Sequence, residues 1–319
     1  MTLTLAVEGE GLRELRAGQV EMSIEIPNYR IIEKLGIGAQ TRVYRARCMP
    51  TGKDYTVKVV KIVNPEDASF IDLLKAEYAI GSVIDHPAIR KVYELRLLRH
   101  RFRVRGAVIF MEYINGITLA DKDFRRSLDE TLAIFDEAAA GLNAMHLAGY
   151  VHADLKPTNI MVTVEGTVKL IDLGQSARIF EPKTKIQGTV DYMAPEQVQR
   201  GKLDQRTDVF GLGATLHKVL TGRAIVTDMN QTVNLQSNTP LVRRQDDGKS
   251  ITNEYPACIT RMISDCCQPD PAARIPDMQA VRERIGLARA ILARKSEDVA
   301  TAPVTESEVH DGDTDEIII

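Results

Sequence analysis

The sequence predicts an α+β protein of two lobes, in which a strand-rich N-terminal half precedes a helix-rich C-terminal half. Short segments rich in Val, Ile and Tyr, separated by Gly and Pro, occupy residues 29–112. Amphipathic or wholly apolar segments of helical period follow residue 116. The length of 319 residues is enough for a two-lobed unit with a substantial core.

Composition argues against several classes of protein. The net charge of -3 argues against general attraction to nucleic acid or to an anionic membrane. The four cysteines lack CxxC spacing, which argues against a structural zinc site and favours reduced thiols. No apolar run is long enough to span a bilayer, and the N-terminus has no signal-peptide pattern. We therefore expect a cytoplasmic protein with no membrane span and no nucleic-acid partner.

The N-terminal half is predicted to be a small antiparallel sheet with one helix. Residues 1–28 are weakly patterned and form an N-terminal extension. The pattern predicts strands at 29–36, 42–48, 54–60, 91–99 and 104–112, and a helix at 67–84.

The C-terminal half is predicted to be mainly helical. Ser127 and Glu130 fit a capping box that opens a helix, and Gly149 fits its left-handed end. The segment 208–222 is apolar on more than one face, which predicts a buried helix. Further helices are expected near 256–268 and 277–292. The acidic residues 291–319 are predicted to be a disordered tail.

Two features of the N-terminal strands could belong to a binding or catalytic site. Gly36 and Gly38, in GIGAQTRV, could let backbone N–H groups approach phosphate oxygens, although a plain hairpin turn explains them as well. Lys58 lies inside an apolar strand, where it needs an anionic partner, and Glu77 on the following helix is the candidate. The alternative is an exposed edge lysine.

The segment VHADLKPTNIMV, residues 151–162, gathers an acid, a base and an amide in one loop. Together with KLIDLG, GTVDYMAPEQ and DVFGLG, in that order, it resembles the eukaryotic-like (Hanks-type) Ser/Thr protein kinases, and bacterial members especially. The resemblance implies the kinase fold over residues 29–290, with an N-lobe at 29–114 and a C-lobe at 115–290.

The resemblance implies the catalytic roles. Asp154 would accept or orient the proton of the substrate hydroxyl, and Lys156 would lie beside the transferred phosphate. Thr189 would hold both of these side chains. Lys58, held by Glu77, would pair with the α- and β-phosphates of ATP.

The nucleotide and metal sites are likewise implied. Asn159 and Asp172 would supply hard oxygen ligands to Mg²⁺, or to Mn²⁺ in its place. The expected nucleotide-binding residues are Leu35, Gly36, Gly38, Val43, Lys58, the gatekeeper Met111, and the backbone of Glu112 and Ile114.

Other matches are structural, and one departs from the family. Glu196 and Arg274 resemble the ion pair that ties the activation segment to the C-lobe, and Asp208 would hold the backbone of the catalytic loop. Ala153 replaces the arginine that, in other members, pairs with a phosphate on the activation segment. We therefore expect basal activity that does not require phosphorylation there.

Two segments lie outside the family pattern. The stretch 90–106 is dense in Arg and Lys, which indicates either a solvated hairpin or a docking patch for an acidic partner. The tail offers Thr301, Thr305, Ser307 and Thr314 as phosphorylation targets, and a phospho-dependent partner could bind them.

The motifs together predict an ATP-dependent protein kinase acting on Ser and Thr of protein substrates. The alternatives are a catalytically weak, kinase-like scaffold or binding module, and a small-molecule kinase. The presence of all five residues Lys58, Glu77, Asp154, Asn159 and Asp172 weakens the scaffold alternative. GTVDYMAPEQ weakens the small-molecule alternative, because that segment builds a platform for protein substrates.

Overall fold

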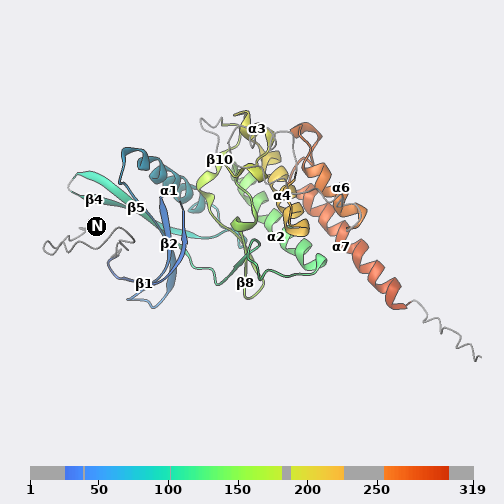
Figure 1. Ribbon diagram of the computed structural model, residues 1–319, viewed down its shortest axis with the longest axis horizontal. Coiled ribbons are helices and arrows are strands. Elements are labelled where there is room, and N and C mark those ends of the chain that lie inside the picture. Colours follow the sequence, from blue (N-terminus) through green and yellow to red (C-terminus); the bar gives the residue numbers. More distant parts are fainter. Residues whose placement is uncertain (1–25, 39, 101, 182–187, 226–254, 302–319) are drawn as a thin grey trace, which may run out of the picture.

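A computed structural model describes residues 26–38, 40–100, 102–181, 188–225 and 255–301. It has two lobes, a sheet with one helix and a larger helical part, which lie side by side in Figure 1. The predicted α+β architecture is therefore confirmed.

The N-terminal lobe is built on a five-stranded antiparallel sheet. The strand order is β1-β2-β3-β5-β4. The strands are β1 Tyr29–Ile37, β2 Thr41–Cys48, β3 Asp54–Lys61, β4 Val92–His100 and β5 Arg103–Glu112. Their bounds agree with the predicted strands to within about two residues.

Alternating side chains give this sheet two apolar faces. On β5, Ala107, Ile109 and Met111 pack with helix α1, Ala68–Gly81, whereas Val108 and Phe110 pack on the opposite face. This period of two also puts Lys58 on the same face of β3 as Val60, toward α1. The strand pattern thereby directs the lysine inward.

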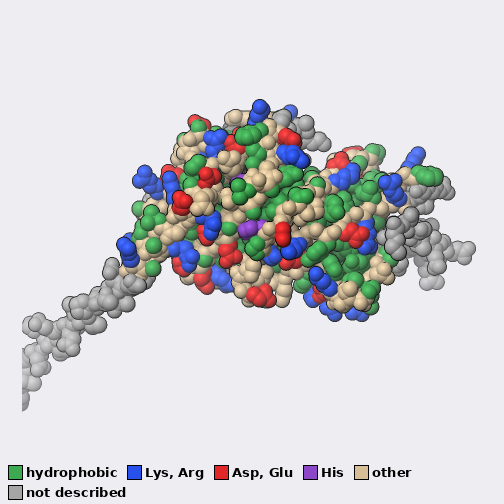
Figure 2. All heavy atoms as spheres, turned by 180° about the vertical axis from the view of Figure 1, so that it is seen from behind, with side chains coloured by type: hydrophobic (Ala, Val, Ile, Leu, Met, Phe, Trp, Pro, Cys, Tyr) green, Lys and Arg blue, Asp and Glu red, His purple; other side chains and the backbone are tan. Residues whose placement is uncertain are grey.

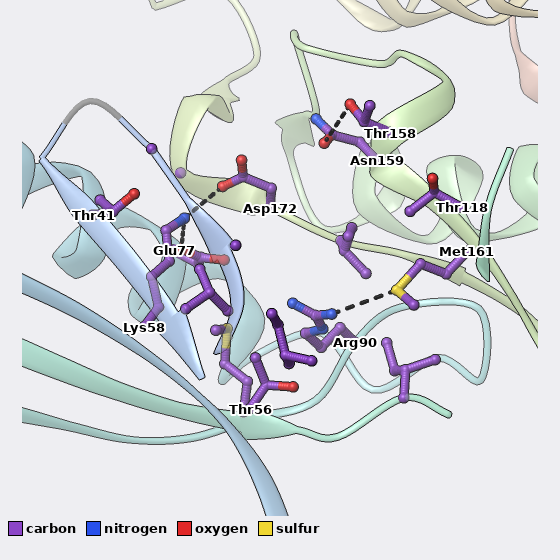
Figure 3. A pocket seen from close by; sticks show the side chains of 18 of the residues that line it. Thr41, Thr56, Lys58, Glu77, Arg90, Thr118, Thr158, Asn159, Met161 and Asp172 are labelled. Atoms are coloured by element: carbon purple, nitrogen blue, oxygen red, sulfur yellow. Dashed lines mark hydrogen bonds and ion pairs between the residues drawn. The ribbon is translucent and has the colours of Figure 1, made fainter. Parts of the chain in front are cut away.

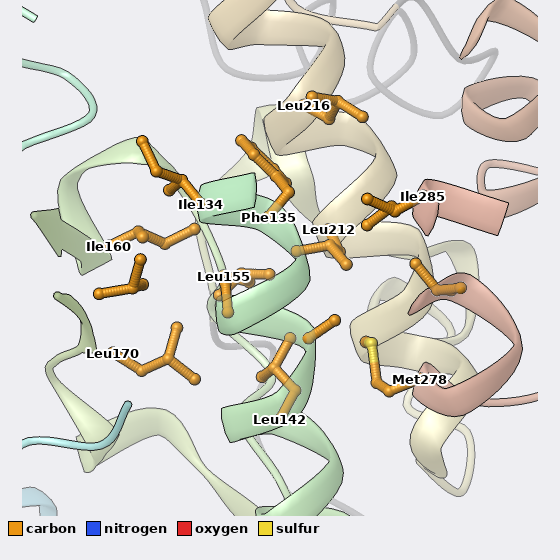
Figure 4. Packing of buried hydrophobic residues seen from close by; sticks show 14 of the residues in the cluster. Ile134, Phe135, Leu142, Leu155, Ile160, Leu170, Leu212, Leu216, Met278 and Ile285 are labelled. Atoms are coloured by element: carbon orange, nitrogen blue, oxygen red, sulfur yellow. The ribbon is translucent and has the colours of Figure 1, made fainter. Parts of the chain in front are cut away.

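The C-terminal lobe packs four main helices around one core (Figure 4). They are α2 Leu128–Leu147, α4 Gln205–Thr221, α6 Ala257–Cys266 and α7 Met278–Thr301. The predicted capping box is present, since Ser127 accepts from the N–H of Glu130 and the Glu130 carboxylate accepts from the N–H of Ser127. Helix α4 is buried over 207–216, as its all-round apolar pattern predicts.

Residues 116–198 contain several very short elements that the sequence pattern did not reveal. They are β6 Gly116–Thr118, β7 Tyr150–Val151, β8 Ile160–Thr163, β9 Val168–Leu170, β10 Ala177–Arg178 and α3 Pro195–Val198. Strands β6, β8 and β9 form one small sheet, and β7 pairs with β10. The predicted catalytic loop lies between β7 and β8, so both of its ends are fixed by sheet hydrogen bonds.

The last helix corrects one prediction. Helix α7 continues to Thr301, so residues 291–301 are helical and not part of a disordered tail. Ala, Leu, Arg, Lys and Glu dominate this stretch, and all of them are strong helix formers, which outweighs the polar composition. Residues 302–319, and the extension 1–25, lie outside the described residues.

The surface carries charges of both signs. Figure 2 shows acidic and basic side chains interspersed over one face of the molecule, with no large region of a single sign. Within the part of the chain that the structure describes, no helix is long and apolar enough to cross a bilayer.

Candidate active site

The side chains of Asp154 and Lys156 in the catalytic loop meet Thr189, which lies 33 residues beyond Lys156. The Lys156 ammonium donates to Oδ2 of Asp154 at 2.8 Å and to Oγ1 of Thr189 at 2.8 Å. The Thr189 hydroxyl donates in turn to Oδ1 of Asp154 at 3.0 Å. The amide of Asn159 donates to the Asp154 carbonyl at 2.9 Å. Each oxygen of the Asp154 carboxylate therefore has a fixed partner, which orients the group.

The backbone of this loop is held from the buried helix α4. The carboxylate of Asp208 accepts from the N–H groups of His152 and Ala153, both at 2.8 Å, and lies 2.8 Å from Nε2 of His146. Burial by itself raises the pKa of Asp208, but the contact with His146 and these N–H groups hold it below its usual value. Ala153 adopts φ 60°, a left-handed conformation that these hydrogen bonds stabilise.

A lysine lies between two carboxylates at the junction of the lobes. Nζ of Lys58 donates to Glu77 at 2.9 Å and to Asp172 at 2.7 Å, so the predicted pair with Glu77 is present. Burial lowers the pKa of Lys58, yet the two carboxylates outweigh it and raise this pKa above its ordinary value. For Asp172 the effects have the opposite sign. Burial raises the pKa of this carboxyl, but the charge and hydrogen bond of Lys58 outweigh burial and lower the pKa below its ordinary value. The Lys58 ammonium and the Asp172 carboxylate are therefore both charged at neutral pH.

Lys58, Glu77 and Asp172 line a cavity of about 750 Å³ between the lobes (Figure 3). The cavity is large enough for a nucleotide. Of the predicted nucleotide-binding and metal-binding residues, the following line it: Leu35, Gly36, Gly38, Val43, Lys58, Met111, Ile114, Asn159 and Asp172. Glu112 does not line it. Its carboxylate pairs with Lys169 at 2.9 Å, and its N–H donates to the Lys91 carbonyl.

The backbone near the cavity leaves groups available to a ligand. Among the described residues, the N–H of Ile114 has no hydrogen-bond partner, so a purine could accept from it. A Cβ at Gly36 would meet no atom within 4 Å, so this glycine borders open space on the cavity side. At Gly38, by contrast, a Cβ would collide with the Thr41 hydroxyl. The glycine there allows a tight turn in which the Gly38 N–H donates to the Thr41 carbonyl at 2.8 Å.

Two oxygen ligands for a cation are present beside the cavity. The Asn159 side chain donates through its nitrogen to Asp154, which turns its Oδ1 away from that bond. Asp172 has φ 62°, a conformation that Asp tolerates better than most residues, and one of its oxygens bonds Lys58. Carboxylate and amide oxygens are what Mg²⁺ prefers, and it takes its other ligands from phosphate and water. The donor set therefore fits Mg²⁺, although no three His, Cys, Asp or Glu side chains in the described segments are placed to hold a metal ion by themselves.

The segment after the cavity is tied down at its far end. Arg274 donates to both oxygens of Glu196, each at 2.8 Å, which is the pair that the sequence predicts. Gln197 adds a contact that the sequence did not suggest, because its amide donates to the Ala153 carbonyl at 2.8 Å. Residues 182–187, including Thr184, lie outside the described residues.

The basic stretch 90–106 is not one surface. Arg96 pairs with Glu94 and stacks on Phe110, with 4.4 Å from its guanidinium carbon to the ring centroid. Arg90 lies on the other side of the sheet and lines the cavity. Sequence reasoning missed Arg90 as a site residue because its basic neighbours made the whole run resemble a solvated hairpin. It also missed Thr56 and Met161, which line the same cavity and carry no motif signal.

The chain belongs to the protein kinase domain family, whose sequence model matches residues 29–284. It is 31% identical over 203 residues to the Serine/threonine-protein kinase PknB of Mycobacterium tuberculosis (strain ATCC 25618 / H37Rv), which covers 61% of this chain and 32% of that protein. It is 29% identical over 269 residues to the Probable serine/threonine-protein kinase CA_C1728 of Clostridium acetobutylicum, covering 81% of this chain and 39% of the relative. The chain thus spans less than half the length of these curated relatives. The predicted resemblance to bacterial members is confirmed.

Replacement of Lys58 by Met tests the ion-pair cluster. From the sequence one expects a stability close to wild type, because an unpaired Glu77 could rotate toward water. In the structure, however, Glu77 is only 2% exposed, so the loss of Lys58 would leave a shielded carboxylate. We now expect Lys58→Met to lose activity and also about 1–3 kcal/mol of unfolding free energy, the cost of an unsatisfied buried group.

Urea unfolding measures this loss. Lys61→Met, on the same strand but without an ion pair in the described structure, is the matched control and should lose under about 0.5 kcal/mol. Equal losses in the two variants would show that the cluster does not stabilise the fold.

Proposed function

We propose that this protein is an ATP-dependent protein kinase that transfers the γ-phosphoryl group of ATP to Ser and Thr hydroxyls of proteins. One observation carries the proposal. The Asp154 carboxylate, oriented by Lys156 and Thr189, is hydrogen-bonded to Asn159. Asn159 lines the nucleotide-sized cavity together with the cluster of Lys58, Glu77 and Asp172. Phosphoryl transfer depends on this kind of positioning and charge stabilisation more than on covalent catalysis.

Each side chain has a role in this mechanism. The Asp154 carboxylate accepts a hydrogen bond from the attacking hydroxyl and orients it. It takes the hydroxyl proton as the new P–O bond forms, while the bond from the γ-phosphorus to the β–γ bridging oxygen breaks and ADP leaves with that oxygen. Lys156 and Lys58 supply positive charge to the phosphate oxygens. Glu77 keeps Lys58 in place, and Thr189 keeps Asp154 and Lys156 in place.

The carboxylate of Asp172 and the amide oxygen of Asn159 are the proposed ligands of Mg²⁺, with Mn²⁺ as the alternative ion. When bound, the ion would neutralise phosphate charge. The substrate polypeptide would lie in a second hollow, of about 500 Å³, which Lys156, Thr189 and Tyr192 line. This hollow adjoins the catalytic loop, so a hydroxyl presented there is close to Asp154.

A kinase-like scaffold would have the same fold without transfer. Incubation with ATP labelled at the γ-phosphate and a generic basic protein separates these functions. Label on Ser and Thr of the protein supports the proposal. Nucleotide binding with no label on any hydroxyl would favour the scaffold, and label on a small molecule alone would favour a small-molecule kinase.

The activation segment gives a prediction about control. Ala153 packs against Val151 and Leu203 and has no group that could pair with a phosphate. Gln197 and the pair of Glu196 with Arg274 hold the end of the segment instead. We therefore expect Thr184→Ala and phosphatase-treated wild type each to retain activity within about tenfold of the untreated protein, a barrier change under about 1.4 kcal/mol.

Initial rates on the same protein substrate measure this. A loss well beyond tenfold in both samples would mean that phosphate does order the segment.

Two further parts of the function are proposed on sequence alone. The hydroxyls of Thr301, at the end of α7, and of Thr305, Ser307 and Thr314 would be phosphorylated and would then bind a phospho-dependent partner. The last three lie outside the described residues. The proposed location is the cytoplasm, supported by the four cysteines, all of which are free thiols.

A further inference from the structure

Arg90 is a cation that lines the cavity and has no counter-ion among the described residues. It precedes β4, and its guanidinium points into the cavity between Thr56 and Met161 (Figure 3). The side chain is half-buried. Its Nη2 has one soft acceptor, the sulfur of Met161 at 3.7 Å, and its shielded Nε has no partner. It makes no ion pair with any described residue, so it has donors to spare.

The unmatched charge has an energetic consequence. Burial lowers the pKa of Arg90, and the carboxylates of Glu77, Asp172 and Glu112 only partly oppose this. A ligand that brings hydrogen-bond acceptors to the guanidinium would relieve the cost of the unpaired group. Val92, two residues after Arg90, pairs with Met111 across the sheet, so such a ligand must reach the part of the cavity that Met111 lines.

That part of the cavity is where the base of a nucleotide would lie. The N–H of Ile114 is available on one side, and the apolar side chains of Val43 and Met161 line the slot. The phosphates would be drawn to Lys58, beside Gly36 and Gly38. Arg90 would therefore meet an edge of the purine, and the hydrogen-bond donors and acceptors on that edge decide which base binds better.

The two common purines differ at this edge. Guanine presents two adjacent acceptors, N7 and O6, which match the forked donors of a guanidinium. Adenine presents the acceptor N7 beside the N6 amino group, which is itself a donor and opposes an N–H. A guanidinium in the base slot therefore favours a 6-oxopurine.

We propose that Arg90 is a specificity-determining residue that lets a 6-oxopurine nucleotide, GTP, serve alongside ATP as a phosphoryl donor. The inference rests on the proposed kinase function, because it assumes that the cavity is the nucleotide site. Binding can nevertheless be measured without turnover.

The experiment measures Kd values for ATP, GTP, ITP and 7-deaza-GTP by calorimetry in the presence of Mg²⁺, with no protein substrate. For the wild type we expect the Kd for GTP to lie within about tenfold of the Kd for ATP. ITP should follow GTP, because it shares N7 and O6, and 7-deaza-GTP should bind more weakly than GTP. These comparisons need no variant. They fail if GTP does not bind, or if 7-deaza-GTP binds as well as GTP.

Arg90→Met then tests the residue itself. The ratio Kd(GTP)/Kd(ATP) should rise at least about tenfold, the lower end of what one bidentate guanidinium contact provides. Arg96→Met, whose side chain lies on the opposite face of the sheet over Phe110, is the control and should leave the ratio unchanged. An unchanged ratio in Arg90→Met would overturn the proposal. If ATP binds and GTP does not, only this inference fails. If neither nucleotide binds, the kinase function fails as well.

Discussion

Asp172→Asn is expected to abolish phosphoryl transfer while leaving the fold intact. The substitution keeps the shape of the side chain and its tolerance of the left-handed backbone at φ 62°. It removes the negative charge that pairs with Lys58 and that we propose as a ligand of Mg²⁺. The loss of transition-state stabilisation should be several kcal/mol, so the rate should fall by roughly a thousandfold or more.

Stability should change little in this variant. Lys58 retains Glu77 as a partner at 2.9 Å, and the Asp172 side chain is 41% exposed. We expect a change in unfolding free energy of under about 1 kcal/mol. Asp72→Asn, an exposed carboxylate on α1, is the matched control and should retain full activity. Turnover like that of the wild type in Asp172→Asn, at saturating Mg²⁺, would refute the assignment of this residue.

The largest expected effect on stability belongs to Arg274→Met. The Arg274 side chain is 0% exposed and donates to both oxygens of Glu196. It also donates to three backbone carbonyls, those of Gln268, Arg206 and Pro269. Removing the cation leaves three carbonyls without this donor and leaves the shielded Glu196 carboxylate with the Thr207 hydroxyl, at 2.9 Å, as its partner. Breaking a buried pair in this way costs about 3–5 kcal/mol.

A second arginine gives the comparison. Arg282 pairs with Asp136 on the surface, at 2.9 Å, with side chains 37% and 30% exposed. Arg282→Met should lose at most about 1 kcal/mol, since exposed pairs contribute little. Equilibrium urea unfolding of both variants measures the difference. If Arg274→Met loses no more than Arg282→Met, the buried pair does not anchor this segment.

Much of the site could be predicted from the sequence because its parts lie in short motifs. Asp154, Lys156 and Asn159 are within one loop, and their mutual hydrogen bonds follow from that closeness. The pairing of Lys58 with Glu77 was predictable for another reason. A lysine on the inward face of a strand requires an anion, and the next helix offers one.

Other features could not be predicted, and each has a physical reason. Strands of two to four residues, such as β7 and β10, are too short to show a period of two. Arg90 points into the cavity because of where β4 begins. The number of Arg and Lys residues in the stretch 90–106 does not reveal which of them points inward. The extension of α7 to Thr301 depends on helix propensity in a stretch whose acidity suggested disorder.

The fate of the γ-phosphoryl group decides most directly whether this chain is a Ser/Thr protein kinase. Wild-type protein, Asp172→Asn and Asp72→Asn are each incubated with γ-labelled ATP, Mg²⁺ and a protein substrate, and the labelled amino acids are identified after hydrolysis. We expect phosphoserine and phosphothreonine with the wild type and with Asp72→Asn, and none above background with Asp172→Asn. Label that is absent from all three samples, or equal in all three, would contradict this assignment.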